Sequence, residues 1–420
     1  MKHPYLFKPQ DLSPRIRYEK LFSNLLTFPQ DSPKRGRPPF SKLSLLKALI
    51  YSSLRGLPSL SELAFELKNN PIMAETLGFP AWEAPPSVER FSHFLRSTHN
   101  EELQVIRLFL VHQLIEEKVI TGESVSIDSC PIEANVKENN LKTSVKSRFD
   151  KNHRPPGDPD ARLGVKIHYL QPFKKKIVFF WGYRNHILND ATSELPFHEC
   201  TLPADKDEKK QAVPLLEESM TFFSLPVKYV IGDANYDTEE ILSHILNEMN
   251  ATPIIPRNPR RTKSKEFKIK KDTVFCAANV EMYRKGKMTV KGKTYLQYCC
   301  PLYYGKKYQG LYLICPAGHP KFFSQKGCNY LMRLTPNVRD RIDYGGIRFK
   351  QQYKLRTSVE RVFSRLLALT MQKPTVIGLQ ATENHCTIAH ITVLLVALMA
   401  HRLGYDDKIR FVKSFLPNLA

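Results

Sequence analysis

Three consecutive β-like segments, followed by helices that alternate with strands, constrain the fold of this chain most strongly. The three segments are rich in β-branched and aromatic residues, which favour strands. Consecutive hairpin strands followed by α/β alternation predict a mixed sheet with helices on its faces, so we expect an α/β fold. The three β-like segments are SVSID (124–128), RLGVKIHYLQ (162–171) and KKIVFFWGYRNHI (175–187). They are followed by a predicted helix near 206–223, the strand VKYVIGD (227–233), the helix TEEILSHILNEM (238–249) and the strand ATPIIPR (251–257).

The chain is strongly basic. Its 63 Lys and Arg residues exceed its 41 Asp and Glu residues, which gives a formal charge of +22. A charge of this size indicates a polyanionic partner, and we expect nucleic acid, although a basic surface can also serve solubility alone.

Nothing in the sequence predicts a membrane protein or a secreted one. The start, MKHPYLFKPQ, lacks the apolar core of a signal peptide. The longest apolar stretch, Ile388 to Ala400, is interrupted by His390 and is too short to span a bilayer, so it predicts a buried terminal helix. We expect a soluble intracellular protein whose eight cysteines are mostly free thiols or metal ligands.

With 420 residues, the chain is predicted to contain several domains. Serine caps at Ser41, Ser59 and Ser87 and a longer helix near Glu101 to Glu117 predict a helical N-terminal region. This region is either a packing or dimerisation domain or a helix-turn-helix-like DNA reader, and both interpretations stay open because no helix shows a clear base-reading face. The expected domains are a helical N-terminal DNA-binding or dimerisation domain (1–120), the first part of the α/β core (121–258), a β-rich basic insertion (259–345), and a returning core helix with C-terminal helices (346–420).

Two aspartates follow β-like segments. An aspartate at the end of a strand often caps the next helix. Asp237, just before Thr238, is better placed than Asp233 to cap the following helix, so Asp233 is predicted to be spare. Asp128 precedes Ser129-Cys130-Pro131, where no long helix begins. Both carboxylates are therefore candidate magnesium ligands.

Glu360 is the third candidate, on the predicted helix YKLRTSVERVFSRL. Tyr353, Arg356 and Glu360 fall on one stripe of this helix, because steps of three and four return to nearly the same face. The alternative is a surface ion pair between Arg356 and Glu360. Glu360 is nevertheless expected beside the buried edge of the helix, because the neighbouring face is apolar at Val359, Val362, Phe363 and Leu366.

Several basic residues are candidate DNA contacts. Lys142, Lys146 and Arg148 lie in a charged, Pro-rich linker, 137–159, that we predict to be mobile until DNA or metal orders it. Arg35 and Arg37, in KRGRPPF, are similar to an AT-hook core, which can lie in a narrow minor groove; a plain linker before the helix at Ser41 is the favoured interpretation.

Five cysteines gather in the insertion, with His319 four residues after Cys315. A structural zinc site is one interpretation, but without a Cys-x-x-Cys pair the pattern favours buried free thiols. His186 is interpreted as a packed core histidine rather than a phosphate or metal contact. The five cysteines are Cys276, Cys299, Cys300, Cys315 and Cys328.

The order of strand Asp, strand Asp, insertion and helix Glu resembles a bacterial insertion-sequence transposase of the DDE superfamily. The resemblance is carried by DSCPIEANVKENN, GDANYD and YKLRTSVE around the three acids, and by GLPSLSELAFELKNNPIMAETLGF in the N-terminal helices. Such elements carry a Tyr, an Arg, a Glu and a Lys at fixed spacing, and this chain has Tyr353, Arg356 and Glu360 in place, so the resemblance implies that Tyr353 and Arg356 contact DNA. The position of the Lys, seven residues after the Glu, is Leu367 here; Arg361 and Arg365 are candidate substitutes for its DNA contact.

The resemblance implies an RNase H-like core that uses two Mg²⁺ (or Mn²⁺) ions. It implies that Asp128 bridges the two ions and that Asp233 and Glu360 each hold one. The partners implied are double-stranded DNA, as element ends with terminal inverted repeats and as target, and a second copy of the chain on that DNA. A cytoplasmic, nucleoid-associated bacterial protein with no membrane contact follows.

Two other functions remain open. One is a catalytically inactive, transposase-derived DNA-binding protein. The presence of all three acids, Asp128, Asp233 and Glu360, argues against this function. The other is a structure-selective nuclease of the same fold, which would not need the long insertion between Asp233 and Glu360.

Overall fold

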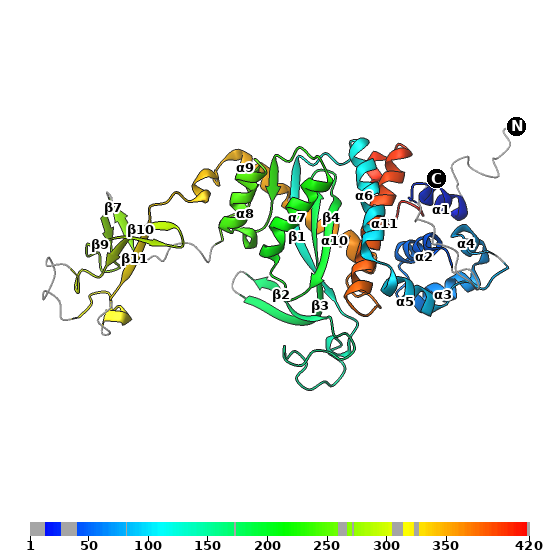
Figure 1. Cartoon of the computed structure of the whole chain (residues 1–420), viewed down its shortest axis with the longest axis horizontal. Coiled ribbons are helices and arrows are strands. Elements are labelled where there is room, and N and C mark those ends of the chain that lie inside the picture. The colour runs from blue at the N-terminus through cyan, green and yellow to red at the C-terminus, as the bar shows by residue number, and fades with distance from the viewer. Residues whose placement is uncertain are drawn as a thin grey trace. The chain divides into compact units, whose positions relative to one another are not determined.

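The computed structural model describes residues 13–26, 40–80, 82–171, 174–258, 267–270, 273–304, 314–322 and 327–417. The chain divides into two compact units, one formed by Met1–Ile255 with Gly345–Ala420 and the other by Pro256–Tyr344 (Figure 1).

A mixed sheet forms the centre of the larger unit. β3 (Lys174–Asp190) pairs antiparallel with β1 (Ser124–Glu133), β2 (Arg162–Gln171) and β4 (Leu195–Pro203). The short strands β5 (Tyr229–Ile231) and β6 (Thr252–Ile254) continue the sheet parallel to β1. The sheet has the order β2-β3-β1-β5-β6, and β4 also pairs with β3. Without β2, three antiparallel strands (β4, β3 and β1) are followed by two parallel ones, as in an RNase H-like fold, and the predicted fold class is confirmed.

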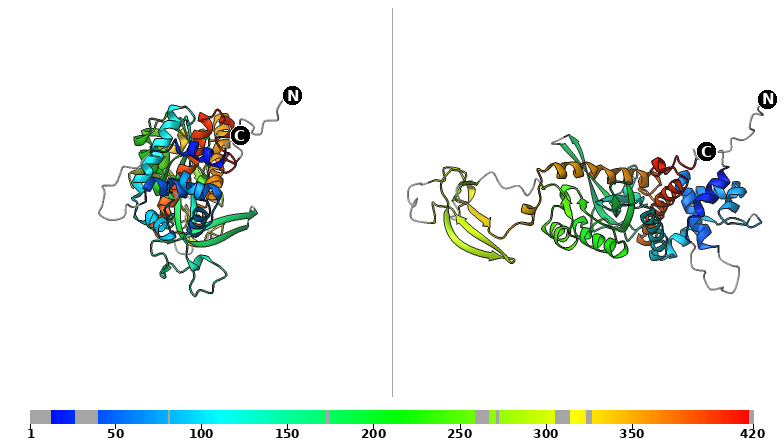
Figure 2. Two further views of the ribbon diagram at one scale, coloured as in Figure 1. Left: turned by 90° about the vertical axis from the view of Figure 1, so that its right-hand side faces the viewer. Right: turned by 90° about the horizontal axis from the view of Figure 1, so that it is seen from above.

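β3 changes partner halfway along its length at Gly182. Residues before Gly182 pair with β2, and residues after it pair with β1 and β4. A Cβ at Gly182 would lie 2.0 Å from the carbonyl oxygen of Ile132, so only glycine lets the two backbones approach this closely. The β2–β3 ribbon beyond this point projects from the body of the unit (Figure 2).

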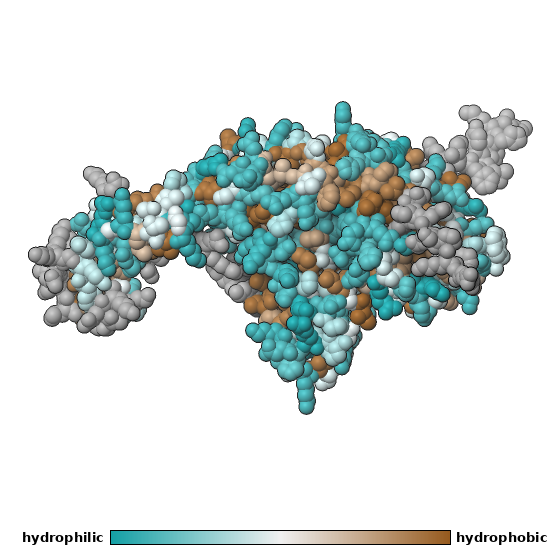
Figure 3. All heavy atoms as spheres, in the orientation of Figure 1, coloured by the Kyte–Doolittle hydropathy of each residue, from teal (hydrophilic) through white to brown (hydrophobic). Residues whose placement is uncertain are grey.

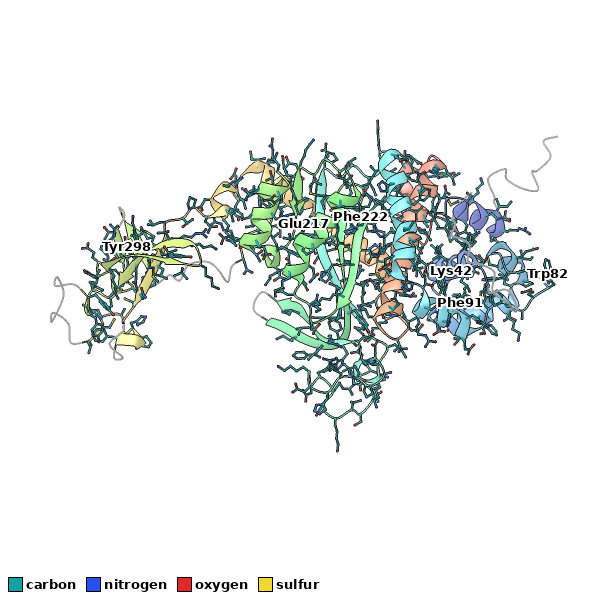
Figure 4. The ribbon with its side chains drawn as sticks, viewed as in Figure 1. Lys42, Trp82, Phe91, Glu217, Phe222 and Tyr298 are labelled. Carbon is teal, nitrogen blue, oxygen red and sulfur yellow. The ribbon has the colours of Figure 1, made fainter. Side chains whose placement is uncertain are left out.

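Helices precede the sheet and cover it. Ser41, Ser59 and Ser87 occupy the predicted N-cap positions of α2 (Lys42–Arg55), α3 (Leu60–Asn69) and α5 (Val88–Ser97), and the side chain of Ser59 accepts the capping hydrogen bond from Glu62; Ser41 and Ser87 make no such bond. Gly56 ends α2 with φ of 67°, in the left-handed region that glycine adopts readily. The remaining N-terminal helices are α1 (Pro14–Phe22), α4 (Pro71–Thr76) and α6 (Asn100–Glu116). Figure 4 shows Phe91 among these helices and Trp82, which is 85% exposed, at their outer edge.

The apolar C-terminal stretch forms α11 (Leu379–Arg402). This helix is long and apolar enough to cross a membrane by length and composition, but 89% of its most apolar window is buried within the unit. It packs against α2, α5, α6 and β4, and the predicted buried terminal helix is confirmed.

β4 was not predicted from the sequence. Its buried residues include polar ones, which obscure the alternation expected of a strand. Glu199 is 3% exposed and accepts hydrogen bonds from Asn185 (2.7 Å), Gln104 (2.7 Å) and Thr387 (2.8 Å). Partners on β3, α6 and α11 therefore satisfy a carboxylate that the interior would otherwise exclude.

The remaining helices of the larger unit lie between and after the strands. α7 (Glu208–Phe222) follows β4 and begins at the cap Asp207, and α8 (Glu239–Ser243) follows β5. After the smaller unit the chain returns as α9 (Ile347–Tyr353), a short 3₁₀ turn at Lys354–Arg356, and α10 (Thr357–Ala368). The predicted single helix is thus two helices joined by a tighter turn.

The smaller unit is β-rich. Its main sheet has the order β11-β10-β9, built from β9 (Tyr283–Val290), β10 (Lys293–Cys299) and β11 (Asn329–Arg333). A second pair is formed by β7 (Lys268–Lys270) and β8 (Thr273–Phe275). Tyr298, labelled in Figure 4, belongs to a small core with Val274, Met282 and Leu296.

Replacing Gly182 by Ala is expected to destabilise the larger unit by about 3 kcal/mol, because the new methyl group would overlap the backbone of β1. Urea unfolding of the two proteins measures the difference. Gly157→Ala is the control, since the nearest atom to its Cβ is 3.8 Å away. Equal losses in the two variants would contradict the close approach at Gly182.

Candidate active site

The pairing of β1 with β5 brings two aspartates together. The strands are parallel, and Ser126 of β1 lies opposite Ile231 of β5. Asp128 and Asp233 each follow these paired residues by two positions, so they lie at the same level of the sheet. Their charges interact: burial, together with Asp233 and Glu208, raises the pKa of Asp128 to about 7.

Asp233 is not the spare residue that the sequence predicted. Its Oδ1 accepts a hydrogen bond from the backbone N–H of Asn235 (2.8 Å) and caps a 3₁₀ turn at Ala234–Tyr236. Thr238, not Asp237, caps α8. The prediction failed because this extra turn stands between the strand and the helix, so each segment has its own cap. Asp128 is held in a similar way, by the N–H of Ser129 (2.7 Å).

Two polar contacts fix α10 against β1 and β3. Ser358 is fully buried, and its Oγ lies 3.2 Å from Oγ of Ser126 on β1 and accepts from Asn189 on β3 at 3.2 Å. The apolar residues predicted to pack this helix, Val359, Val362, Phe363 and Leu366, are all buried. α10 therefore lies next to the strand that carries Asp128.

Glu360 forms the ion pair that the alternative interpretation predicted. Its Oε1 lies 2.8 Å from Nη2 of Arg356, and its side chain is 53% exposed. Arg356 also interacts electrostatically with Asp128. The guanidinium of Arg356 thus lies in the field of both Glu360 and Asp128. Tyr353, which interacts electrostatically with Asp233 and Glu360, stacks on Phe349.

Three residues that the sequence did not single out complete this cluster. Glu208, the first residue of α7, is ion-paired with Arg184 of β3. Tyr236 is buried, and its hydroxyl has no hydrogen-bond partner among the described residues. Burial and the carboxylates of Asp128, Glu208 and Asp233 raise the pKa of Tyr236 well above its ordinary value. Only Glu208, at the start of a predicted helix, carried any signal in the sequence.

Arg361 and Arg365, which were predicted to contact DNA, both bind Glu194 in the turn between β3 and β4. Arg361 donates from Nε (2.7 Å) and Arg365 from Nη2 (2.8 Å) to this carboxylate, which is 7% exposed. Arg365 is itself 14% exposed. Both residues thus tie α10 to the sheet.

The other predicted DNA contacts differ in their surroundings. Lys142 and Lys146 are exposed, whereas Arg148 donates to the backbone carbonyls of Glu138 and Asn140 (2.8 Å each). Arg148 thus links two parts of the segment 137–159, which we predicted to be a mobile linker. Arg35 and Arg37 lie outside the described residues. Leu367 is partly buried on α10.

The candidate zinc ligands gather only in part. The thiol of Cys328 is in hydrogen-bonding contact with those of Cys276 and Cys300. This contact, together with hydrogen bonds from backbone N–H groups, lowers the pKa of Cys276 and of Cys300 to about 6. All eight cysteines are free thiols. His186 is 2% exposed, and burial lowers its pKa to about 4, as expected of a core histidine.

The two aspartates suit a divalent cation chemically. They present only carboxylate oxygens, which Mg²⁺ prefers. Burial and the neighbouring negative charges disfavour the ionised form of Asp128, and a bound cation would compensate this charge. Across the described part of the chain, however, no three Asp, Glu, His or Cys side chains are spaced to hold a metal ion. Glu360 is turned toward Arg356 instead.

Two family descriptions match the sequence. "Transposase domain (DUF772)" matches residues 12–97, and "Transposase DDE domain" matches residues 165–395, more than half of the chain. Asp233 and Glu360 fall within the second match, and Asp128 precedes it. No curated protein matches. Among solved structures, a piggyBac transposase synaptic complex with hairpin DNA is similar over 97% of this chain and 85% of that chain, with 11% identity and a TM-score of 0.37.

Glu194→Gln is expected to reduce the stability of the larger unit by about 3 kcal/mol, because it leaves the partly buried Arg365 without a charged partner. Urea unfolding provides the measurement. Glu123→Gln is the matched control, since it removes an ion pair with Lys228 in which both side chains are more than half exposed, and it is expected to cost less than about 1 kcal/mol. Similar costs for both variants would show that Glu194 does not anchor α10.

Proposed function

The chain belongs to the DDE transposase family, and we propose that it binds the terminal inverted repeats of an insertion sequence, cleaves DNA strands at the element ends and joins them to target DNA. In this proposal Asp128, Asp233 and Glu360 form the metal-dependent catalytic site. The observation that carries it is the register of β1 with β5, which sets two aspartates at one level of the sheet beside the helix that bears Glu360.

Two Mg²⁺ or Mn²⁺ ions, when bound, supply the Lewis acidity that activates a water molecule and stabilises the leaving oxygen. Asp128, Asp233 and Glu360 are the residues that would hold these ions. The hydroxyl of Tyr236, which is buried and lacks a partner in the described residues, is available to donate to a water or carboxylate oxygen in this site.

Glu360 has to leave Arg356 to reach a shared ion. Both side chains lie on α10 or the turn before it, and Glu360 is half exposed, so its side chain has room to change rotamer. The released guanidinium of Arg356 then faces the site and can neutralise a phosphate of the DNA. The same exchange explains why the ion pair and the catalytic role of Glu360 are compatible.

The DNA partner accounts for the charge of the chain. A formal charge of +22 favours binding to phosphates without sequence preference, and Lys142 and Lys146 are exposed for such contacts. Hydrophilic residues cover most of the visible face of the larger unit (Figure 3). We further propose that two copies act together on paired element ends, and that the protein works in the bacterial cytoplasm, associated with the nucleoid.

The test is cleavage and strand transfer on a plasmid that carries the gene with its native flanks. Asp233→Asn and Glu360→Gln are expected to lower the Mg²⁺-dependent cleavage rate by about 10³-fold, as expected for loss of a major electrostatic contributor. Asp205→Asn, an exposed aspartate in the loop after β4, is the control and is expected to cleave at the wild-type rate. Chelation by EDTA is expected to abolish cleavage, and added Mn²⁺ to restore it.

Three outcomes separate the candidate functions. Cleavage at the flank boundaries with joined products, lost in both site variants, supports transposition. Tight binding to the flanks without cleavage in any protein would indicate a catalytically inactive DNA-binding protein. Cleavage without joining would indicate a nuclease.

A further inference from the structure

One ion pair connects to both aspartates of the proposed site. Arg184 of β3 and Glu208 of α7 are in contact, and their side chains are 15% and 20% exposed. Neither belongs to the three acids assigned to the reaction. Each of them makes a second contact toward a different aspartate.

On the side of Asp128, the connection runs through Ser129. Arg184 donates from Nη1 to Oγ of Ser129 (3.3 Å), and the N–H of Ser129 donates to Oδ1 of Asp128 (2.7 Å). Arg184 also donates from Nη2 to the carbonyl oxygen of Val165 on β2 (2.8 Å), so its guanidinium is fixed at several points.

On the side of Asp233, the connection runs through Asn235. The side-chain amide of Asn235 donates to Oε2 of Glu208 (3.1 Å), and its backbone N–H donates to Oδ1 of Asp233 (2.8 Å). Each aspartate therefore accepts a hydrogen bond from the backbone of a nearby residue, Ser129 or Asn235. The side chains of these two residues in turn bind the Arg184–Glu208 ion pair.

We propose that the Arg184–Glu208 ion pair is a positioning pair, which holds the carboxylates of Asp128 and Asp233 in the relative orientation that metal binding requires. This inference rests on the proposed function of the two aspartates. β5 is only three residues long, and Asp233 lies beyond its end on a short 3₁₀ turn, so the sheet alone restrains Asp233 weakly. The contact from α7 through Asn235 supplies the missing restraint.

Charge and geometry predict opposite effects for one substitution. Arg184→Met removes a positive charge that is linked to Asp128 through Ser129, so electrostatics alone would make a cation bind more tightly. If Arg184 instead orients the two carboxylates, the variant binds the cation more weakly. Loss of such outer contacts typically weakens metal binding by about 10–100-fold.

The experiment is a Mn²⁺ titration of the full-length protein, followed by isothermal calorimetry or by electron paramagnetic resonance of the free ion. Arg184→Met is expected to weaken Mn²⁺ binding about 10–100-fold. Glu208→Gln retains an acceptor for Asn235 but loses the ion pair, so a smaller loss is expected. Arg184→Lys keeps the charge but cannot make all of the arginine's contacts, and an intermediate loss is expected even if Arg184→Met folds poorly.

Glu123→Gln is the control for general loss of an ion pair, since its partnership with Lys228 lies at the surface. Thermal unfolding of every variant checks that the fold is retained. Unchanged or tighter Mn²⁺ binding in Arg184→Met and Arg184→Lys, with a wild type that binds Mn²⁺ and cleaves DNA, would overturn the positioning role alone. A wild type that neither binds Mn²⁺ nor cleaves would overturn the proposed function as well.

Discussion

The parallel pairing of β1 with β5 is the constraint on which the rest of the structure depends. A shift of the register by one residue would turn one aspartate to the opposite face of the sheet, because side chains alternate along a strand. The observed register, Ser126 opposite Ile231, keeps Asp128 and Asp233 at one level. The pairing is short, so the surrounding contacts have to hold it: β3 pairs along the whole of β1, and β6 closes the other side of β5.

Placing carboxylates beside one another in a protein interior opposes folding. Burial and acidic neighbours raise the pKa of Asp128. The buried hydroxyl of Tyr236 has no hydrogen-bond partner in the part of the chain described. The remainder of the larger unit offsets this cost through apolar packing on α11 and through charges that are fully paired, such as Glu194 with Arg361 and Arg365. A site that is unfavourable without its ligand gains stability when the ligand binds.

The sequence was sufficient to predict the α/β class, the serine-capped helices and the buried C-terminal helix, because each depends on local periodicity or on a single cap. It did not reveal β4, since Glu199 and His198 are stabilised by partners on other elements that no local pattern shows. Asp128, Asp233 and Glu360 were selected from their positions relative to predicted elements. Glu208 and Arg184 were missed because they meet only in the folded chain. The contacts of Arg361 and Arg365 with Glu194 were missed for the same reason, because Glu194 lies 167 and 171 residues away in sequence.

The central claim is that Asp128, Asp233 and Glu360 act as one metal-dependent site. Anomalous scattering from Mn²⁺ in crystals of the protein with DNA bearing the element ends tests it most directly. Mn²⁺ peaks are expected between the carboxylates of Asp128 and Asp233, with Glu360 turned from Arg356 toward an ion. Crystals that contain the DNA but show no peak at the aspartates, with Glu360 still paired to Arg356, would contradict it.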